Sequence, residues 1–289
     1  MDYSLEVMAS RVSVRSYDGK PIAPGLLRDL SAAVVDSVPG PFGGRARFVV
    51  LGPELEEGTS SGQLLRSGSI GTYGLISKVS AFIAGAIAKA PHAFEDFGYS
   101  MEGLVLKATE LGLGSCWIGG LFDRGAAGAA LELGQDEYLP AVVSIGLPAN
   151  KKSVAESITR RLARAGTRKP FEELFFADEM GASLHLPSAP WRRVLEAVRM
   201  APSASNKQPW RILATGPEGR LRFDLLLEED RRYNSMLGAI RLQNIDMGIA
   251  MRHFESAAHS LGLPGAWTRI EPYPLRLEGP RSYIASWIV

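Results

Sequence analysis

The chain has 289 residues, of which 46% are hydrophobic, and it carries 32 basic against 31 acidic side chains. This length fits one large domain or two of medium size, and the hydrophobic share is that of a globular protein with a buried core. The formal net charge is +1, without the basic excess that nucleic-acid-binding proteins normally show. The composition therefore argues against a nucleic-acid binder.

Cys116 is the one cysteine of the sequence. It excludes an internal disulfide framework and a cysteine-rich zinc site, and it fits a reducing cytosol. The first twenty residues are charged from Asp2 onward and contain no apolar stretch of the kind found in signal peptides. The most apolar run, 81–88, ends at Lys89 and is far too short to span a bilayer. We therefore expect a cytoplasmic protein that does not enter a membrane.

Local patterns predict helices and strands in mixed order. Pro24 and Pro190 suit the first turn of a helix, where the missing N–H is not needed, and β-branched or apolar runs predict strands. Apolar residues from Met101 to Ala108 recur at helical spacing, and Gly112, a residue type that commonly ends helices, follows them. In chain order, the predicted elements are a helix over 24–35, strands over 47–51 and 80–87, a helix over 99–111, a strand over 138–145, a helix over 190–200, and strands over 211–215, 221–227 and 282–289.

The sequence contains an internal repeat at an offset of 150 residues, in which segment 96–117 corresponds to segment 246–267. A second similarity, between 47–54 and 211–218, occurs upstream in the same order. Such a pattern predicts a duplicated unit. We expect an α+β fold with a first half over 1–170 and a second, shorter half over 171–289, packed together as two similar lobes. The shared residues are Asp96 and Asp246, Gly98 and Gly248, Met101 and Met251, Ala108 and Ala258, Leu111–Leu113 and Leu261–Leu263, and Trp117 and Trp267.

Several familiar motifs are incomplete. Segment 112–117 begins like a dinucleotide-binding fingerprint, but Trp117 stands where the third glycine belongs and a predicted helix precedes it. Segment 58–62 has the spacing of a hydrolase nucleophile turn, but two glutamates precede it and no strand leads into it. His253 and His259 lie six residues apart on one predicted helix and point to different sides, so they do not indicate a metal site.

The segment Arg11-Val12-Ser13-Val14-Arg15 is the first candidate for chemistry. In an extended segment the alternate side chains of Arg11, Ser13 and Arg15 point the same way. Two guanidinium groups and a hydroxyl suit a phosphate, which arginine can bind in a bidentate manner. The alternative is a solvated edge strand with surface arginines, and the spacing alone favours it.

The second candidate is segment 201–210, Ala-Pro-Ser-Ala-Ser-Asn-Lys-Gln-Pro-Trp, which directly follows a predicted helix. Proline, serine and asparagine favour turns, so its backbone amides and side-chain carbonyls are available to hydrogen-bond a polar heterocycle. The alternative is a connection from helix to strand in which Trp210 fills the core. The residues by themselves leave both interpretations open.

Together the two segments resemble the nitroreductase family of FMN-dependent flavoproteins. In that family an N-terminal Arg-x-Ser-x-Arg segment holds the FMN phosphate, and a Pro-Ser-x-x-Asn-x-Gln-Pro-Trp loop contacts the flavin from the opposite subunit of an intertwined dimer. The resemblance extends over nearly the whole chain. It also includes the segments 111–119, 144–148 and 168–174.

The resemblance implies roles for individual residues. The phosphate would be held by Arg11, Ser13, Arg15 and Arg168. The flavin ring and ribityl chain would contact Pro202, Ser203, Ala204, Ser205 and Asn206. The redox-active edge would lie near Gly98, Tyr99 and Ser100, with Thr72 at the ring pyrimidine and backbone contacts from Ile118, Gly119 and Gly120. An alternative for Gly98 is the packing of a duplicated helix, since Gly248 repeats it.

The chain departs from the family pattern in an instructive way. The two flavin-binding segments lie in different halves, whereas in the family both lie near the start of one subunit. Segment 38–44 of the first half lacks the asparagine, glutamine and tryptophan, and segment 180–185 of the second half lacks the arginine pair. If the halves pack like two subunits, they form one complete flavin site and one defective site. The chain then resembles single-chain, internally duplicated members of the family, and it could act as a monomer.

The resemblance implies an FMN-dependent oxidoreductase that takes a hydride from NADH or NADPH and reduces a small organic acceptor, such as a nitroaromatic compound or a quinone, in a ping-pong reaction. No protein acid–base group is needed, because the flavin carries the chemistry, and no metal is expected. Two alternatives remain: a flavin-binding carrier or sensor with little turnover, and a protein that has lost FMN and serves as an interaction module.

Overall fold

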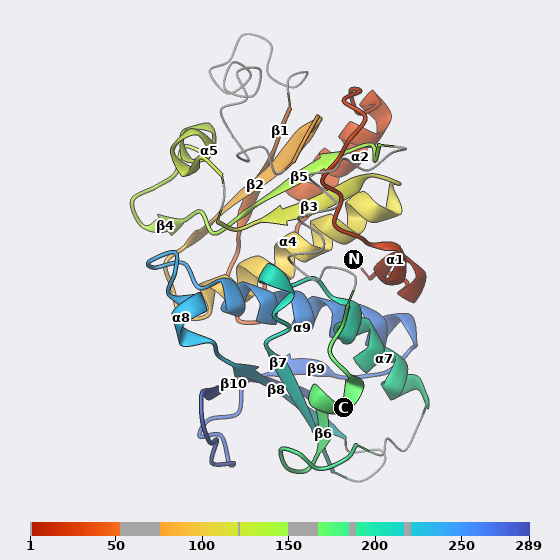
Figure 1. Cartoon of the computed structure of the whole chain (residues 1–289), viewed down its shortest axis with the longest axis vertical. Coiled ribbons are helices and arrows are strands. Elements are labelled where there is room, and N and C mark those ends of the chain that lie inside the picture. Colours follow the sequence, from red (N-terminus) through yellow and green to blue (C-terminus); the bar gives the residue numbers. More distant parts are fainter. Residues whose placement is uncertain (1, 53–75, 121, 150–166, 185–188, 217–220) are drawn as a thin grey trace.

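The computed structural model describes residues 2–52, 76–120, 122–149, 167–184, 189–216 and 221–289. Two mixed groups of strands and helices stand one above the other in Figure 1, with a pair of long helices between the two sheets. The first sheet draws its strands from residues 47–146 and the second from residues 175–288.

The first sheet is antiparallel. Its order is β1 (Arg47–Leu51), β2 (Ala81–Ala88), β5 (Val142–Gly146) and β3 (Gly114–Ile118), and the short β4 (Glu137–Tyr138) also pairs with β2. Seven of the eight residues of β2 and all of β5 are buried, which explains why these strands read as continuous apolar runs instead of alternating ones.

The second sheet has the order β6 (Phe175–Ala177), β7 (Trp210–Thr215), β8 (Arg222–Glu228), β10 (Arg281–Ile288) and β9 (Ala266–Thr268). Strand β6 runs parallel to β7, and the other pairs are antiparallel. Trp210, which begins β7, is fully buried in the core, as one of the interpretations of segment 201–210 predicted.

The helices are α1 (Leu5–Ser10), α2 (Pro24–Val35), α4 (Ala93–Glu110), α5 (Arg124–Ala130), α7 (Ala189–Met200), α8 (Arg231–Asn234) and α9 (Leu242–Ser260), with short 3₁₀ turns at Phe171–Glu173 and Ala204–Asn206. Pro24 lies in the first turn of α2, and Leu27, Leu30 and Val34 on its buried face follow helical spacing. None of the helices in the described part of the chain is long and apolar enough to cross a bilayer.

Most predicted elements match the structure within one residue, but two predictions need correction. Helix α4 begins at Ala93 instead of near Tyr99, because the buried carboxylates Glu95 and Asp96 belong to its first turn, where the helix dipole favours negative charge. The strand predicted over 138–145 is interrupted between β4 and β5. Pro140 lies in that interval and has no N–H for a strand ladder.

The repeated helices α4 and α9 end in the same way. Gly112 and Gly262 follow the two helices with φ angles of +75° and +67°, a conformation that glycine adopts without steric cost. In each copy the second residue beyond the cap donates to a carbonyl of the last turn, from Leu113 N to Ala108 O at 2.8 Å and from Leu263 N to Ala258 O at 2.9 Å. This is the Schellman arrangement, so Gly112 ends its helix as the sequence predicts.

Helices α4 and α9 also touch each other through the repeated glycines Gly98 and Gly248. A Cβ atom at Gly98 would lie 2.1 Å from the carbonyl oxygen of Ile245, and one at Gly248 would lie 1.9 Å from the carbonyl oxygen of Glu95. Both neighbours are backbone atoms, which cannot rotate away. The two helices can therefore cross at this distance only where both positions are glycine.

Replacing either crossing glycine by alanine should destabilise the fold. We expect Gly98→Ala and Gly248→Ala each to lower the free energy of unfolding by about 1–3 kcal/mol or more, as overpacked cores do. Chemical denaturation followed by circular dichroism measures the change. Gly25→Ala in the first turn of α2 is the control, because the nearest atom to its Cβ is a side-chain nitrogen of Arg28 at 4.0 Å. A Gly98→Ala protein as stable as the wild type would contradict the close crossing.

Candidate functional site

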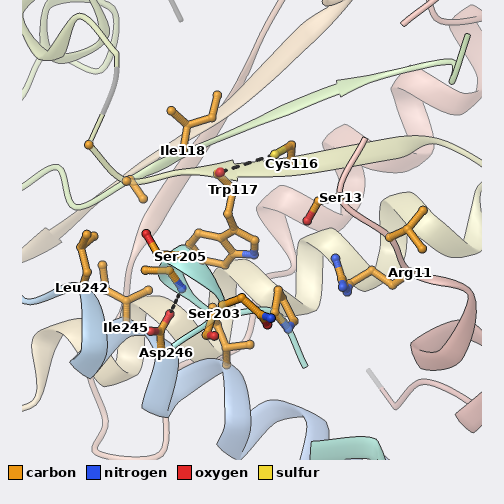
Figure 2. A pocket seen from close by; sticks show the side chains of 18 of the residues that line it. Arg11, Ser13, Cys116, Trp117, Ile118, Ser203, Ser205, Leu242, Ile245 and Asp246 are labelled. Carbon is orange, nitrogen blue, oxygen red and sulfur yellow. Dashed lines mark hydrogen bonds between the residues drawn. The ribbon is translucent and has the colours of Figure 1, made fainter. Parts of the chain in front are cut away.

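A cavity of about 740 Å³ lies where the two groups of elements meet, within the size range of sites for small molecules. Figure 2 shows the N-terminal segment on one side, β3 above, and the loop after α7 together with the start of α9 below. Most of the wall comes from regions that are far apart in the sequence, namely 9–15, 116–120, Arg168, 199–206 and 233–249.

One end of the cavity is strongly cationic, with Arg11, Arg15, Arg168 and Arg199 in its wall. Among the described residues, Arg11 Nε and Arg15 Nη1 are buried without a hydrogen-bond partner. Burial, together with the nearby charges of Arg11 and Arg199, lowers the pKa of Arg168 to about 10. Burying several cations together is costly unless an anion compensates them. This end of the cavity is therefore suited to an anion.

A buried network holds the arginine end against the helix pair. Glu102 on α4 accepts hydrogen bonds from Trp117 Nε1 at 2.7 Å and lies 2.9 Å from His253 Nε2 on α9. Arg11 Nε lies 4.0 Å from the same carboxylate. Burial lowers the pKa of Arg11, and the Glu102 charge opposes that shift. The negative charge of Glu102 thus compensates the positive charge of Arg11 only in part, because the same carboxylate also contacts Trp117 and His253.

The N-terminal segment reaches the cavity as an extended strip beside β3. Val14 N donates to Ser115 O at 2.8 Å, and Ser77 N donates to Arg15 O at 2.9 Å. This pairing fixes the register, so that Arg11, Ser13 and Arg15 all line the cavity. The three residues that the alternation singled out thus reach one cavity, although Val12 between them also belongs to its lining.

The loop after α7 holds three non-glycine residues in the left-handed region, with φ of 48° at Ser205, 53° at Asn206 and 47° at Gln208. Such conformations cost about 1–3 kcal/mol each and often mark ligand sites. Side chains on both sides hold the loop in place: Ser203 Oγ accepts from Gln208 N at 2.9 Å, and Gln208 Oε1 accepts from Lys169 N at 2.9 Å. The loop is therefore a fixed wall of the cavity.

Asn206 connects this loop to the arginine end. Its Nδ2 donates to Thr167 O at 3.0 Å, and its Oδ1 accepts from Arg168 Nη1 at 3.4 Å. Arg168 also donates to Met200 O at 3.1 Å. Asn206, a predicted contact of the flavin, thus orients Arg168, a predicted ligand of the phosphate.

Asp246 on α9 lies at the base of the loop and lines the cavity. Its Oδ1 accepts from Ala204 N at 2.9 Å, whereas its buried Oδ2 has no partner among the described residues. Burial raises the pKa of Asp246 to about 8, against the hydrogen bond from Ala204. The carboxyl group is therefore mostly neutral at pH 7.

The repeated residue Asp96 has different surroundings. Its two oxygens accept from Phe42 N at 2.8 Å and from Gly44 N at 2.6 Å, in the 38–44 loop that occupies the corresponding place in the first half. Burial raises the pKa of Asp96 as well, but the two backbone donors oppose the shift. The two copies thus differ in one acceptor atom, which is bonded in Asp96 and has no partner in Asp246.

The other end of the cavity is mostly apolar. It is formed by α8, the turn that follows α8 and the start of α9, with Met236 two-thirds exposed at the rim. These residues carry no motif, so sequence reasoning missed them. They are Tyr233, Met236, Leu237, Leu242, Ile245 and Ile249.

Most of the predicted site residues line this one cavity: Arg11, Ser13, Arg15, Ile118, Gly119, Gly120, Arg168, Pro202, Ser203, Ala204, Ser205 and Asn206. Three predicted residues, Gly98, Tyr99 and Ser100, are not in its lining. Thr72, as well as segment 58–62, lies outside the described residues.

The three residues serve the helix pair instead of the cavity. Gly98 packs on α9, the Tyr99 ring lies 4.8 Å from the Arg252 guanidinium, and Ser100 Oγ donates to Val38 O at 2.9 Å. Each repeated aspartate bonds to the loop of its own half, so the helix start beside loop 202–206 is that of α9. Ile249, which corresponds to Tyr99 in the repeat, does line the cavity. Of the three positions in α9 that correspond to Gly98, Tyr99 and Ser100, only that of Ile249 belongs to the lining.

The raised pKa of Asp246 predicts a pH-dependent stability. Between its ordinary pKa of about 4 and the folded-state value of about 8, the folded chain holds a proton that the unfolded chain has lost, so the free energy of unfolding falls as the pH rises. Asp246→Asn removes this titration. We expect the stability of the variant relative to the wild type to increase by about 1.4 kcal/mol per pH unit between about pH 5 and pH 8, as measured by urea denaturation.

Asp96→Asn is the matched control for that measurement. Both oxygens of Asp96 accept from backbone N–H groups, so an amide NH₂ would face a donor, and this variant should lose stability. A stability difference between Asp246→Asn and the wild type that is the same at both ends of the pH range would show that Asp246 is ionised throughout.

Comparisons with known proteins identify a family and a fold for the chain. The family model described as "Putative TM nitroreductase" matches residues 4–258. A crystal structure of a "putative nitroreductase" from Thermotoga maritima superimposes with a TM-score of 0.57 and 16% identity, over 98% of this chain and 91% of its own. No curated protein matches.

Shorter structures match about half of the chain. A nitroreductase with bound FMN from Desulfitobacterium hafniense aligns with 21% identity and a TM-score of 0.37, over 53% of this chain and 92% of its own. One from Bacteroides fragilis, also with bound FMN, has 23% identity and a TM-score of 0.37, over 52% of this chain and 93% of its own. The family match over most of the chain and the fold shared with the Thermotoga protein support one conclusion: the chain belongs to the nitroreductase family and has the α+β nitroreductase-like fold.

Proposed function

We propose that the chain is an FMN-dependent oxidoreductase and that one FMN binds in the cavity between its two halves, 1–170 and 171–289. The observation that carries the proposal is the cationic end, where Arg11 Nε and Arg15 Nη1 are buried beside Arg168 without a hydrogen-bond partner in the described part of the chain. A phosphate dianion supplies the missing acceptors and compensates the charge. Ser13, in the same wall, adds a hydroxyl donor.

The rest of the cavity fits the remaining parts of FMN. The loop residues Pro202, Ser203, Ala204, Ser205 and Asn206 offer polar groups at one side. On the other side, Gly119 and Gly120 follow Ile118 at the end of β3 and line the cavity with backbone atoms, and the Leu242 side chain packs against Gly119. The apolar residues of α8 and α9 lie beyond them and suit a flat aromatic ring.

When bound, FMN would supply hydride transfer from NADH or NADPH to a small organic acceptor, such as a nitroaromatic compound or a quinone. The side chains of this protein bind and orient the cofactor, and the apolar wall excludes water from the ring. Val12 and Met236 line the cavity and are exposed to solvent, so the reductant and then the acceptor would enter at this rim. This arrangement supports a ping-pong reaction.

A single site per chain follows from how the mirror position is filled. In the first half the Phe42 ring stacks on His92, with centroids 4.3 Å apart, and His92 corresponds to the cavity residue Leu242 in the repeat. Glu95, which corresponds to Ile245, is bonded to Asn244 at 2.8 Å. Charged and stacked side chains thus occupy the place that is apolar in the cavity. Because both walls of the site belong to one chain, a monomer suffices for binding.

Removing side chains of the cavity should weaken FMN binding, whereas changes in loop 38–44 or on the exposed surface should not. Arg15→Ala loses a buried charged donor and Asn206→Ala releases Arg168, so each should raise the Kd for FMN about 10- to 100-fold. Pro39→Ala in the 38–44 loop and Arg28→Ala on the exposed face of α2 are the matched controls. Flavin fluorescence quenching measures all four, and equal losses in the two pairs would contradict a single site.

Reduction of the bound flavin separates an enzyme from a carrier. We expect NADH or NADPH to bleach the flavin absorbance of the FMN-loaded protein without oxygen, and a quinone or a nitroaromatic compound to restore it. A flavin that binds tightly but is not reduced by either nucleotide would indicate the alternative, a flavin carrier or sensor.

A further inference from the structure

The two carboxyl oxygens of Asp246 differ in their hydrogen bonds. Its first oxygen fixes Ala204 N at 2.9 Å, but Oδ2 is buried and without a partner among the described residues. Buried polar atoms are nearly always satisfied, so an exception beside a cavity indicates a missing partner. Asp246 lines the cavity, which makes the bound molecule the natural partner.

The internal repeat provides a built-in comparison for this atom. Asp96 occupies the same position in α4, and both of its oxygens are bonded to N–H groups of loop 38–44, from Phe42 and Gly44. Loop 202–206 supplies one such N–H, from Ala204. The second half thus keeps the aspartate, and its loop supplies one N–H donor fewer.

The groups around Asp246 do not stabilise a negative charge on it. Tyr233 on α8 points its hydroxyl to Ser205 Oγ at 2.9 Å, and the Asp246 charge itself contributes to the raised pKa of this tyrosine. Lys207 pairs with Asp230 at 2.9 Å. Burial is the main cause of the raised Asp246 pKa, and no cation opposes it.

The other charged groups nearby also have partners of their own or lie at the far end of the cavity. On α4, Glu95 accepts from Asn244 at 2.8 Å, and Tyr99 faces Arg252 on α9. The arginine end belongs to the proposed phosphate site. A carboxyl group in these surroundings holds its proton near neutral pH, and a neutral acid has an O–H to donate.

We propose that Asp246 acts as a hydrogen-bond donor in the cavity, its Oδ2–H directed to a carbonyl oxygen or ring nitrogen of the bound flavin. The inference rests on the proposed function, because loop 202–206, to which Asp246 is bonded, is the segment proposed to contact the ring. Asp246 would thereby recognise the acceptor atoms of the flavin ring through Oδ2–H, while Oδ1 holds loop 202–206 through Ala204 N.

The test is the pH dependence of FMN affinity, measured as Kd by fluorescence quenching between about pH 7 and pH 9. Because only the neutral acid donates, the wild type should bind about tenfold more weakly at pH 9 than at pH 7 for a pKa of about 8. The FMN phosphate does not interfere, since its second ionisation, near pH 6, is complete in this range.

Asp246→Asn is the decisive variant. The amide oxygen can still accept from Ala204 N and the amide NH₂ can donate from the position of Oδ2, so FMN should bind as tightly as to the wild type at pH 7 and the affinity should stay constant up to pH 9. Glu95→Gln and Asp96→Asn are the controls, and both should keep the wild-type pH dependence. If the latter does not fold, Glu95→Gln serves alone.

The outcomes separate the inference from the function on which it rests. A pH dependence that is the same in Asp246→Asn and the wild type, or absent from both, would overturn the role of Asp246 and leave the FMN site standing. If the pH dependence of FMN affinity were lost in Glu95→Gln, the responsible proton would belong to Glu95 on α4, and the role of Asp246 would be overturned. A wild-type protein that binds no FMN at any pH would overturn the proposed function itself.

Discussion

The contact between α4 and α9 at Gly98 and Gly248 fixes how the two halves of the molecule pack together. Each glycine faces a backbone carbonyl of the other helix. The helices therefore lie so close together that a side chain at either position would push them apart and disrupt their packing. Both cavity walls depend on this pair. Helix α4 carries Glu102, which bonds to Trp117 on β3 and lies near Arg11, and α9 carries His253, which meets the same carboxylate.

Helices α4 and α9 have similar sequences, but the loops beside them differ between the two halves. Each helix presents an aspartate to the loop of its own half, but loop 38–44 satisfies both oxygens and loop 202–206 satisfies one. In the first half Phe42 also stacks on His92. The difference between a filled position and a cavity therefore comes from a few residues of the loops and of the helix starts, while the helix packing is common to both.

Much of the fold and many of the site residues could be predicted from the sequence, because they depend on local chemistry. Prolines in first turns, glycines after helix ends and apolar strands are properties of short segments, and α2, β1 and the cap at Gly112 follow from them. The candidate phosphate-binding segment Arg11–Arg15 could be predicted for a similar reason, since the alternation of side chains along an extended chain is a local property.

What could not be predicted depends on contacts between distant segments. The start of α4 was placed too late, because the buried partners of Glu95 and Asp96 lie on α9 and in loop 38–44. Assigning Gly98 to the site required knowing which repeated helix meets loop 202–206. The apolar wall around Leu237 and Ile245 has no motif at all, since any large aliphatic side chain could fill the same role.

The number of FMN molecules that one chain binds is the most direct test of this structure as a flavoprotein with one working site. Flavin-free protein of known concentration would be titrated with FMN by calorimetry, and the mass of the complex would be measured in parallel by light scattering. The complementary halves predict one FMN per chain in a monomer. Two FMN per chain would show that the position behind Phe42 and His92 is also a site, and one FMN per two chains would show that the site is completed by a second copy.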